Sequence, residues 1–321
     1  MKSILVTGIG GGVGQGILRN LRALGLQNPI IGTNVERVSA GNHLCDAVYE
    51  VPFAYDDTYV DSIAQIVDDN DVGLVLPSTD YEVYHLALGR DRLGAPVAAS
   101  DARVSRFCLD KLANFETFNR HGIEFARSVL PSAYAGEFER VVVKPREGRG
   151  SRNIHIDPVD PTAFGDDYVV QEYLDGPELT TAFYVRQDGQ LHGSITMSRA
   201  LEHGNTSSAQ VEFAYDAQMD ALLRQLVQTF DFRGSANVQS RVVDRGVVPF
   251  EINCRISGTN SIRSQLGFAD VKYAVQELLL GQEPDAPAVI VGSAIRIMHD
   301  VVYPGLALDE IRDRRDEFRI F

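Results

Sequence analysis

The sequence predicts an α/β protein that begins with a parallel, doubly wound sheet and continues into a second unit with antiparallel strands. Over about the first hundred residues, short β-rich runs alternate with amphipathic stretches of helical spacing, as in parallel sheets. From Val104 onward the strand signals follow one another with turns such as Asp188-Gly189 between them, which favours antiparallel pairing. A length of 321 residues allows two or three packed units.

The predicted elements follow in chain order. In the first unit, we expect strands at 3–7, 29–34, 72–78 and 95–100, and helices at 15–24, 58–70 and 80–93. Ile17, Leu21 and Leu24 share one face of the first helix. In the second unit, we expect a helix at 105–121 that stops at Gly122, strands at 125–130, 140–145, 169–173, 178–185, 192–198, 236–243 and 247–253, and a helix at 271–280.

Composition excludes several classes of protein. Asp and Glu number 44 against 30 Lys and Arg, a net charge of −14 that repels polyanions, so we expect no nucleic-acid partner. Uninterrupted apolar runs are shorter than the roughly 18 residues of a membrane span, so we expect no membrane insertion. Cys45, Cys108 and Cys254 form no CxxC pair, which predicts a reducing, cytoplasmic location and no zinc site.

A first glycine cluster follows the first predicted strand. Gly8, Gly11 and Gly14 make a GxxGxxG pattern that resembles the nucleotide turn of extended short-chain dehydrogenases, in which backbone N–H groups face a phosphate. A tight turn that binds nothing explains the glycines equally well. A NAD-binding oxidoreductase or sensor is therefore one hypothesis, although no Tyr is followed by Lys at the four-residue offset of such dehydrogenases.

A second cluster surrounds Lys144. The β-rich run before it delivers the lysine at the end of a strand, and a loop containing Gly148, Gly150 and Ser151 follows. A lysine fixed on a strand can bind phosphate oxygens while a glycine-rich loop closes over them. Only four lysines occur against 26 arginines, so a lysine at this position indicates a specific role and not a general surface charge. An ordinary exposed hairpin loop is the alternative.

A third cluster is a polar row on the predicted strand 247–253. Alternation places Glu251 and Asn253 on one face, with Arg255 next in the row and Gln239 able to join from the neighbouring strand. Such oxygen donors suit Mg²⁺, with Mn²⁺ as an alternative, held beside nucleotide phosphates. The row also fits an ordinary amphipathic strand when taken alone.

Taken together, these clusters resemble the ATP-grasp superfamily, in particular carboxylate-amine ligases similar to the halves of the carbamoyl phosphate synthetase large subunit. Residues 109–128, with Asp110-Lys111, a helix and then Gly122-Ile123, match a further signature of the family. The resemblance implies a Rossmann-like pre-ATP-grasp domain at 1–103 and a two-lobed α+β ATP-grasp domain at 104–321. The small mobile lobe would span about 125–175 and the C-terminal lobe about 176–321.

The resemblance also implies roles for individual residues. Lys111 and Lys144 would bind phosphate, and Gly148, Gly150 and Ser151 would cover it. The adenine would lie against Glu172, Tyr173 and Leu174, and Glu178 would bind the ribose. Gln239, Glu251 and Asn253 would ligate magnesium, and Arg255 and Arg199 would face the transferred phosphate. Cys254 stands where the family usually has Pro.

The resemblance implies an ATP-dependent enzyme that activates a small carboxylic acid as an acyl phosphate and joins it to an amine. A grasp-fold enzyme that phosphorylates a carboxylate or carbamate without ligation is the alternative. Asp80 follows a strand end, where doubly wound sheets bind ligands, and Thr79 and Glu82 beside it have the spacing of a capping box. We expect the substrates to contact Asp80, Arg199, Arg263 and Arg296, with arginines favouring an anionic acid. The sequence leaves the oligomeric state open, with a homodimer as one option.

Overall fold

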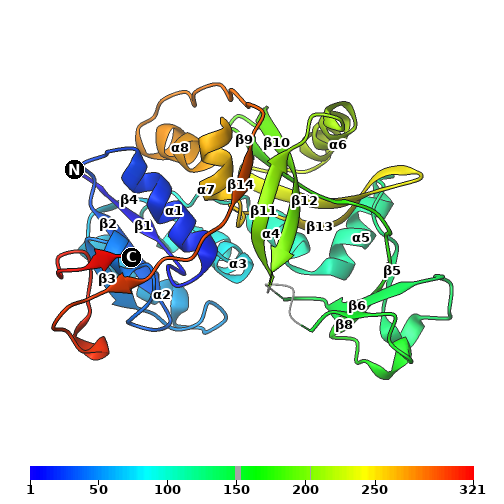
Figure 1. Ribbon diagram of the computed structural model, residues 1–321, viewed down its shortest axis with the longest axis horizontal. Helices are drawn as coiled ribbons and strands as arrows, with labels where there is room; N and C mark the ends of the chain where they lie inside the picture. Colours follow the sequence, from blue (N-terminus) through cyan, green and yellow to red (C-terminus); the bar gives the residue numbers. More distant parts are fainter. Residues whose placement is uncertain (149–152, 203) are drawn as a thin grey trace.

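The computed structural model describes residues 1–148, 153–202 and 204–321, and its N-terminal part is the predicted parallel α/β sheet (Figure 1). The strands β1 (Ser3–Val6), β2 (Ile30–Asn34), β3 (Ala47–Glu50) and β4 (Val72–Leu76) pair in the order β3-β2-β1-β4. The helix α1 (Gly12–Ala23) packs on one face, against Ile4 and Leu74, whereas α2 (Tyr59–Asp69) and α3 (Asp80–Leu88) pack on the other, against Leu5 and Val75. The sheet is therefore doubly wound.

The N-terminal part differs from the sequence prediction in three places. The strand β3 is absent from the prediction, because it is only partly buried and carries a weak apolar signal. The predicted strand 95–100 forms only one parallel bridge, Val75 to Val97. The predicted helix 80–93 ends at Leu88, with Gly89 as its C-cap, and is followed by the 3₁₀ turn η2 (Arg90–Arg92). A Cβ on Gly89 would lie 2.4 Å from Val60 Cγ1, so this position needs glycine.

Two helices, rather than the single predicted helix 105–121, lead out of the first domain. They are α4 (Ala102–Leu109) and α5 (Lys111–Arg120). The chain becomes extended at Asp110, whose carboxylate accepts the backbone N–H of Leu112 at 2.9 Å and that of Ala113 at 3.3 Å. Asp110 thus acts as the N-cap of the second helix.

The small lobe is an antiparallel sheet of short strands. It contains β5 (Ser128–Val129), β6 (Val141–Pro145), β7 (His155–Ile156) and β8 (Tyr168–Glu172), in the order β5-β8-β6-β7. Phe138, Val141, Val143 and Val170 form its own small core. In Figure 1 this green lobe lies on the far side of the molecule from the blue N-terminal domain.

A six-stranded sheet joins these two parts. The strands β9 (Glu178–Val185), β10 (Leu191–Glu202), β11 (Asn205–Val211), β12 (Gly234–Val243), β13 (Gly246–Asn253) and β14 (Ser293–Ile295) pair in the order β13-β12-β9-β10-β11-β14. All of these pairs are antiparallel, as the turn pattern predicted. The overall α/β class is therefore confirmed.

Helices cover this sheet on both faces. The helix α6 (Asp216–Thr229), which the sequence analysis missed, packs Met219, Leu223 and Leu226 into the core that contains Phe183. The opposite face is covered by α7 (Asn260–Arg263) and α8 (Asp270–Ala274). The predicted helix 271–280 is α8 followed by a π-helical turn, η6 (Val275–Leu279). The remaining 3₁₀ turns are η1 (Asn42–Leu44), η3 (Pro131–Ala133), η4 (Pro161–Ala163), η5 (Ser264–Leu266) and η7 (Leu308–Glu310).

The last segment of the chain returns to the N-terminal domain, where red and blue ribbons lie together in Figure 1. It contains the hairpin of β15 (Val301–Val302) and β16 (Arg319–Ile320). Asn42 donates a side-chain hydrogen bond of 2.8 Å to the carbonyl of Arg312, and the Arg314 N–H donates to the Cys45 carbonyl at 2.9 Å. In the described part of the chain, no helix is long and apolar enough to cross a membrane.

Candidate active site

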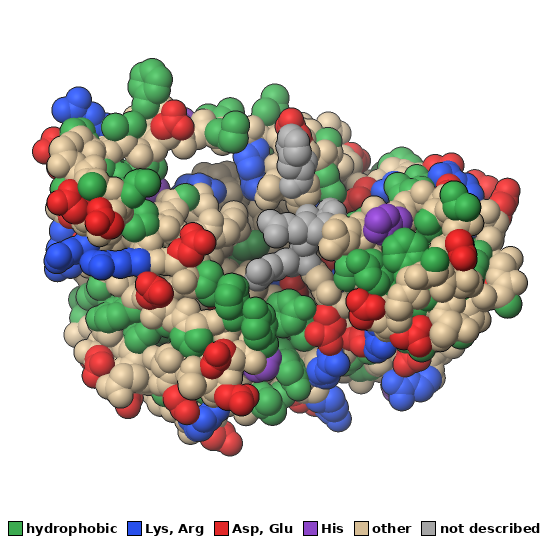
Figure 2. Space-filling model, turned by 90° about the horizontal axis from the view of Figure 1, so that it is seen from below, with side chains coloured by type: hydrophobic (Ala, Val, Ile, Leu, Met, Phe, Trp, Pro, Cys, Tyr) green, Lys and Arg blue, Asp and Glu red, His purple; other side chains and the backbone are tan. Residues whose placement is uncertain are grey.

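A cleft of about 1200 Å³ lies where the N-terminal domain, the small lobe and the six-stranded sheet meet. Its walls include the loops after β1, β2, β3 and β4, the start of α5, the end of β6, and the hairpin of β12 and β13. Figure 2 looks toward this hollow from below. The carboxyl ends of the parallel strands therefore open into the same cavity as the small lobe, which is where doubly wound sheets bind ligands.

Lys144 lies at the cleft because β6 ends there. Its side chain is buried, its Nζ lies 3.4 Å from the Phe250 carbonyl oxygen, to which it donates, and 5.2 Å from the centre of the Phe250 ring. Burial, together with the nearby charge of Lys111, lowers the pKa of Lys144 to about 8, although Glu251 and Glu178 oppose this shift. The ammonium is thus poorly solvated and available for an anionic ligand.

Lys111 reaches the cleft from the first turn of α5. Its backbone N–H donates to the carbonyl of Arg146 at 2.9 Å. The Arg146 guanidinium binds the Asp110 carboxylate, with Nη2 and Oδ2 2.5 Å apart, so the cap of α5 is tied to the residue two positions after Lys144. Neither Asp110 nor Arg146 was predicted from the sequence to have a role in the site. The sequence signal that could have identified Asp110 is its place directly before Lys111, where a short acidic side chain favours a helix N-cap.

The predicted polar row lies on one face of the β12–β13 hairpin. Asn253 donates to Glu251 Oε1 at 3.2 Å, and Gln239 donates to Asn253 Oδ1 at 3.3 Å. Burial raises the pKa of Glu251, but the positive charges of Lys111 and Lys144, the hydrogen bond from Asn253 and the charge of Arg255 together lower it below its usual value. The structure therefore brings both lysines and the row of oxygen donors into one electrostatic cluster.

The donor set of this row is one carboxylate and two amides. No group of three or more His, Cys, Asp and Glu side chains suited to a metal occurs in residues 1–148, 153–202 and 204–321. Mg²⁺ accepts oxygen ligands and often binds through one or two protein carboxylates together with substrate phosphates and water. Glu251, Asn253 and Gln239 fit that kind of shared site, and Zn²⁺ sites usually have a different donor set.

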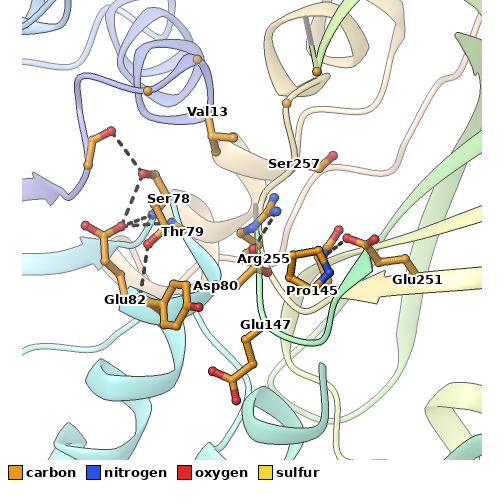
Figure 3. Close-up of a pocket in the computed structure, with 18 of the residues that line it drawn as sticks. Val13, Ser78, Thr79, Asp80, Glu82, Pro145, Glu147, Glu251, Arg255 and Ser257 are labelled. Carbon is orange, nitrogen blue, oxygen red and sulfur yellow. Dashed lines mark hydrogen bonds and ion pairs between the residues drawn. The ribbon is translucent and has the colours of Figure 1, made fainter. Parts of the chain in front are cut away.

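Arg255 and Asp80 meet across the floor of the cleft, as Figure 3 shows. Their Nη2 and Oδ2 atoms are 2.8 Å apart, and both side chains are largely buried. Arg255 Nη1 also donates to the Ile256 carbonyl at 3.2 Å, while its Nε is buried without a hydrogen-bond partner among the described residues. Asp80 is the first residue of α3, which the predicted capping box of Thr79 and Glu82 begins.

Two of the three other predicted arginines line the cleft. Arg199 donates to Glu178 Oε1 from Nε at 2.9 Å and to Gln239 Oε1 from Nη2 at 2.8 Å. It therefore links the predicted ribose carboxylate to the predicted metal row. Arg296 also faces the cleft and donates to the Gly258 carbonyl at 2.7 Å.

Arg263 corrects the sequence prediction. It is fully buried and does not line the cleft. Its guanidinium pairs with Asp270 and donates to Ser257 Oγ at 2.7 Å and Thr259 Oγ1 at 2.8 Å. All of this hydrogen bonding lies within the loop and helix after β13, so Arg263 supports the segment that carries Ser257 instead of facing a substrate.

The predicted nucleotide segment begins at Glu172, the last residue of β8, and its three residues do not line the cleft. The Glu172 carboxylate accepts bonds from Arg127 Nη2 at 3.0 Å and from Arg245 Nη2 at 2.6 Å. Burial raises the Glu172 pKa, but these bonds and the Arg127 N–H lower it overall. The Arg140 guanidinium lies 3.9 Å from the centre of the Tyr173 ring, and Leu174 is buried. The Glu172 side chain thus joins the lobes, and its backbone N–H donates to the Arg127 carbonyl at 2.9 Å.

The two predicted glycine-rich segments have different outcomes. Gly148 lines the cleft, whereas Gly150 and Ser151 lie outside the described residues. In the first segment, Gly8 has φ +59°, and a Cβ there would lie 2.4 Å from Ser78 Oγ. A Cβ on Gly14 would lie 2.5 Å from the Gly8 carbonyl oxygen. Close packing thus accounts for both glycines, although Gly8, Gly11 and Gly12 also border the cleft.

This fold, with paired lysines facing a row of oxygen donors across an interlobe cleft, is that of an ATP-grasp protein. Residues 165–301 match the family described as ATP-grasp in the biosynthetic pathway with Ter operon, and residues 4–97 match the PylC-like N-terminal domain. No curated protein matches the sequence significantly.

Solved structures share the fold at low sequence identity. An N5-carboxyaminoimidazole synthetase from Staphylococcus aureus complexed with ADP is 12% identical, with a TM-score of 0.73 over 90% of this chain and 81% of that one. An L-amino acid ligase from Bacillus licheniformis is 14% identical, with a TM-score of 0.70 over 87% and 74%. The biotin carboxylase domain of a Hydrogenobacter thermophilus 2-oxoglutarate carboxylase, in complex with MgADP and bicarbonate, is 13% identical, with a TM-score of 0.69 over 88% and 70%.

Proposed function

We propose that the protein is an ATP-dependent carboxylate-amine ligase that releases ADP. The observation that carries the proposal is the cluster of Lys111, Lys144 and Arg255 around Glu251 in one cleft. Arg255 is already paired with Asp80, but two lysines remain beside the single carboxylate of Glu251, and the positive charge that Glu251 does not neutralise suits the phosphates of a nucleotide. The similar proteins named above include an ADP complex, an MgADP complex and an amino acid ligase.

The residues have separate roles in this proposal. Lys144 and Lys111 bind phosphate oxygens, and Glu251, Asn253 and Gln239 hold Mg²⁺, which neutralises negative charge on the phosphates when bound. Glu178 binds the ribose, and the backbone of residues 172–174 contacts the adenine. Arg255 faces the phosphoryl group that is transferred, and Asp80 fixes the direction of its guanidinium.

In this reaction the protein positions the reactants and stabilises charge, and no protein side chain forms a covalent intermediate. A carboxylate oxygen of the substrate attacks the γ-phosphorus of ATP, the bond to the β-phosphate oxygen breaks, and ADP leaves. Lys144, Lys111 and Arg255 stabilise the charge that is spread over the phosphoryl oxygens during transfer. The amine then attacks the acyl phosphate, loses a proton and expels inorganic phosphate. Closure of the small lobe excludes water, which would otherwise hydrolyse the acyl phosphate.

A screen of ADP release tests the proposal. Amino acids and small carboxylic acids are supplied singly and in pairs with Mg-ATP, and the active pair should yield an amide with one ADP per bond. Lys144→Met and Glu251→Gln should each reduce turnover by at least a hundredfold, and Glu251→Gln should also raise the Mg²⁺ concentration needed. Lys272→Met and Glu283→Gln, at exposed ion pairs outside the cleft, are the matched controls. Full turnover in Lys144→Met would contradict the proposal.

Hydroxylamine separates ligation from phosphorylation alone. A ligase should form a hydroxamate from the activated acid and an amide when the true amine is present. An enzyme that only phosphorylates should give the hydroxamate but no amide with any amine.

A further inference from the structure

The cleft has apolar side chains along its walls in addition to its charged floor. Five large hydrophobic side chains are solvent-exposed yet line it: Val35 (38% exposed), Phe53 (45%), Tyr55 (63%), Ile154 (42%) and Leu201 (39%). The first three belong to loops of the N-terminal domain, and the other two come from the small lobe and β10. Figure 2 shows hydrophobic side chains gathered along one edge of the hollow. Exposed apolar groups on facing walls of one cleft indicate a ligand that covers them.

The loop between β3 and α2 holds the two aromatic rings in place. Phe53 and Tyr55 are stacked, with ring centroids 5.3 Å apart and planes inclined by 4°. Val51 and Ala54 on either side of Phe53 are buried in the core. The Val51 N–H donates to the Asn34 carbonyl at 2.9 Å. The fold therefore uses this loop's other apolar residues as anchors and leaves both rings facing solvent as a flat surface.

The two rings line the same cleft as the ion pair on its floor. Tyr55 meets Tyr81 edge-on, with centroids 6.3 Å apart. Tyr81 is adjacent in sequence to Asp80, whose carboxylate binds Arg255 at 2.8 Å. Tyr81, Asp80 and Arg255 line the same cleft as the stacked pair, so a ligand with its charged end at Arg255 shares that cleft with the two rings.

We propose that the carboxylic acid which the enzyme activates carries a planar apolar group, as an aromatic amino acid or arylacetic acid does, and that Phe53 and Tyr55 bind this group. The proposal rests on the ligase function above, because that function places the acid's carboxylate at the Arg255 end. An offset-stacked or edge-on aromatic contact favours such a group over an aliphatic chain of similar size. Val35, Ile154 and Leu201 add apolar contact on both walls of the cleft.

Binding to the full-length protein, loaded with Mg²⁺ and a non-hydrolysable ATP analogue, tests this proposal. Titration calorimetry compares phenylacetate with acetate and L-phenylalanine with L-alanine. The aromatic member of each pair should bind at least about tenfold more tightly. Phe53→Ala and Tyr55→Ala should each reduce that preference about threefold to tenfold. Phe213→Ala is the matched control, because Phe213 is as exposed as Phe53, at 45%, but lies outside the cleft, and it should leave the preference unchanged.

The outcomes separate this proposal from the ligase function. Equal binding of acetate and phenylacetate, and of alanine and phenylalanine, would overturn the aromatic proposal, even if ADP release with another acid upheld the ligase. A preference that survives both Phe53→Ala and Tyr55→Ala would overturn the assignment of these rings. Full ADP release by Lys144→Met would instead refute the ligase mechanism, whatever the acid preference.

Discussion

The Arg255 guanidinium and the Asp80 carboxylate form an ion pair of 2.8 Å that links the end of β13 to the start of α3. The pair crosses the floor of the cleft, so it both joins two parts of the fold and directs a cation toward the ligand. Arg255 keeps a buried Nε without a described partner. Its orientation therefore depends strongly on Asp80.

Asp80→Asn should destabilise the protein by about 2 kcal/mol, because it leaves a largely buried guanidinium without its counterion. Urea unfolding at pH 7 measures the change. The control is Asp61→Asn, which removes an exposed ion pair with Arg92 and should cost less than about 1 kcal/mol. Equal destabilisation by both variants would show that the buried pair has no special role.

Lys144→Met should stabilise the ligand-free protein at pH 7. The pKa of Lys144 is lowered from 10.5 to about 8, so holding the charge in the folded state costs about 3 kcal/mol below pH 8. The unfolded chain binds the proton more tightly, and this cost fades as the pH rises from 8 to 10.5. The gain in urea midpoint should therefore be large at pH 7 and small at pH 10.

The control for this measurement is Lys2→Met. The Lys2 side chain is 58% exposed and lies 3.6 Å from Asp71, so its removal should give no comparable gain at either pH. A Lys144→Met protein that is less stable than the wild type at pH 7 would show that interactions with Glu251 outweigh the cost of burial. Lys111 still faces Glu251 in the variant.

Asp110→Asn and Asp110→Ala should separate two functions of one residue. Asparagine retains the helix cap but cannot pair with Arg146, so we expect weaker ATP binding, by about tenfold, and little loss of stability. Alanine also removes the cap bonds to Leu112 and Ala113, which should cost about a further 1 kcal/mol. Calorimetry with Mg-ATP and urea unfolding measure the two effects. Unchanged ATP affinity in both variants would show that Lys111 does not depend on this cap.

Arg263→Lys should lower the stability of the protein and leave its affinity for the substrate unchanged. Lysine cannot reproduce the contacts to Asp270, Ser257 and Thr259, so we expect a loss of about 3 kcal/mol. Arg224→Lys, in an exposed pair with Asp220 on α6, should change stability by less than about 0.5 kcal/mol. A variant with wild-type stability and a raised KM for the acid would restore the original prediction for Arg263.

The sequence predicts those features that follow from local patterns. Strand alternation correctly places Glu251 and Asn253 together, and the β-rich run before Lys144 correctly delivers that lysine to the end of β6. The pairing of Asp80 with Arg255 could not be predicted, because the two residues are far apart in sequence and meet only through tertiary packing, in which α4 contacts both α3 and β13. Arg263 was misplaced because a buried arginine has the same sequence signal as an exposed one until its partner, Asp270, is located.

The segment after β14 couples the thermal unfolding of the N-terminal domain to that of the six-stranded sheet. Its bonds from Arg312 and Arg314 to Asn42 and Cys45 fasten the final residues onto the opening domain. Arg296, near the start of the same segment, also borders the cleft. The N-terminal domain cannot separate from the six-stranded sheet unless these contacts of the C-terminal segment break. We therefore expect the two regions to unfold in one cooperative transition.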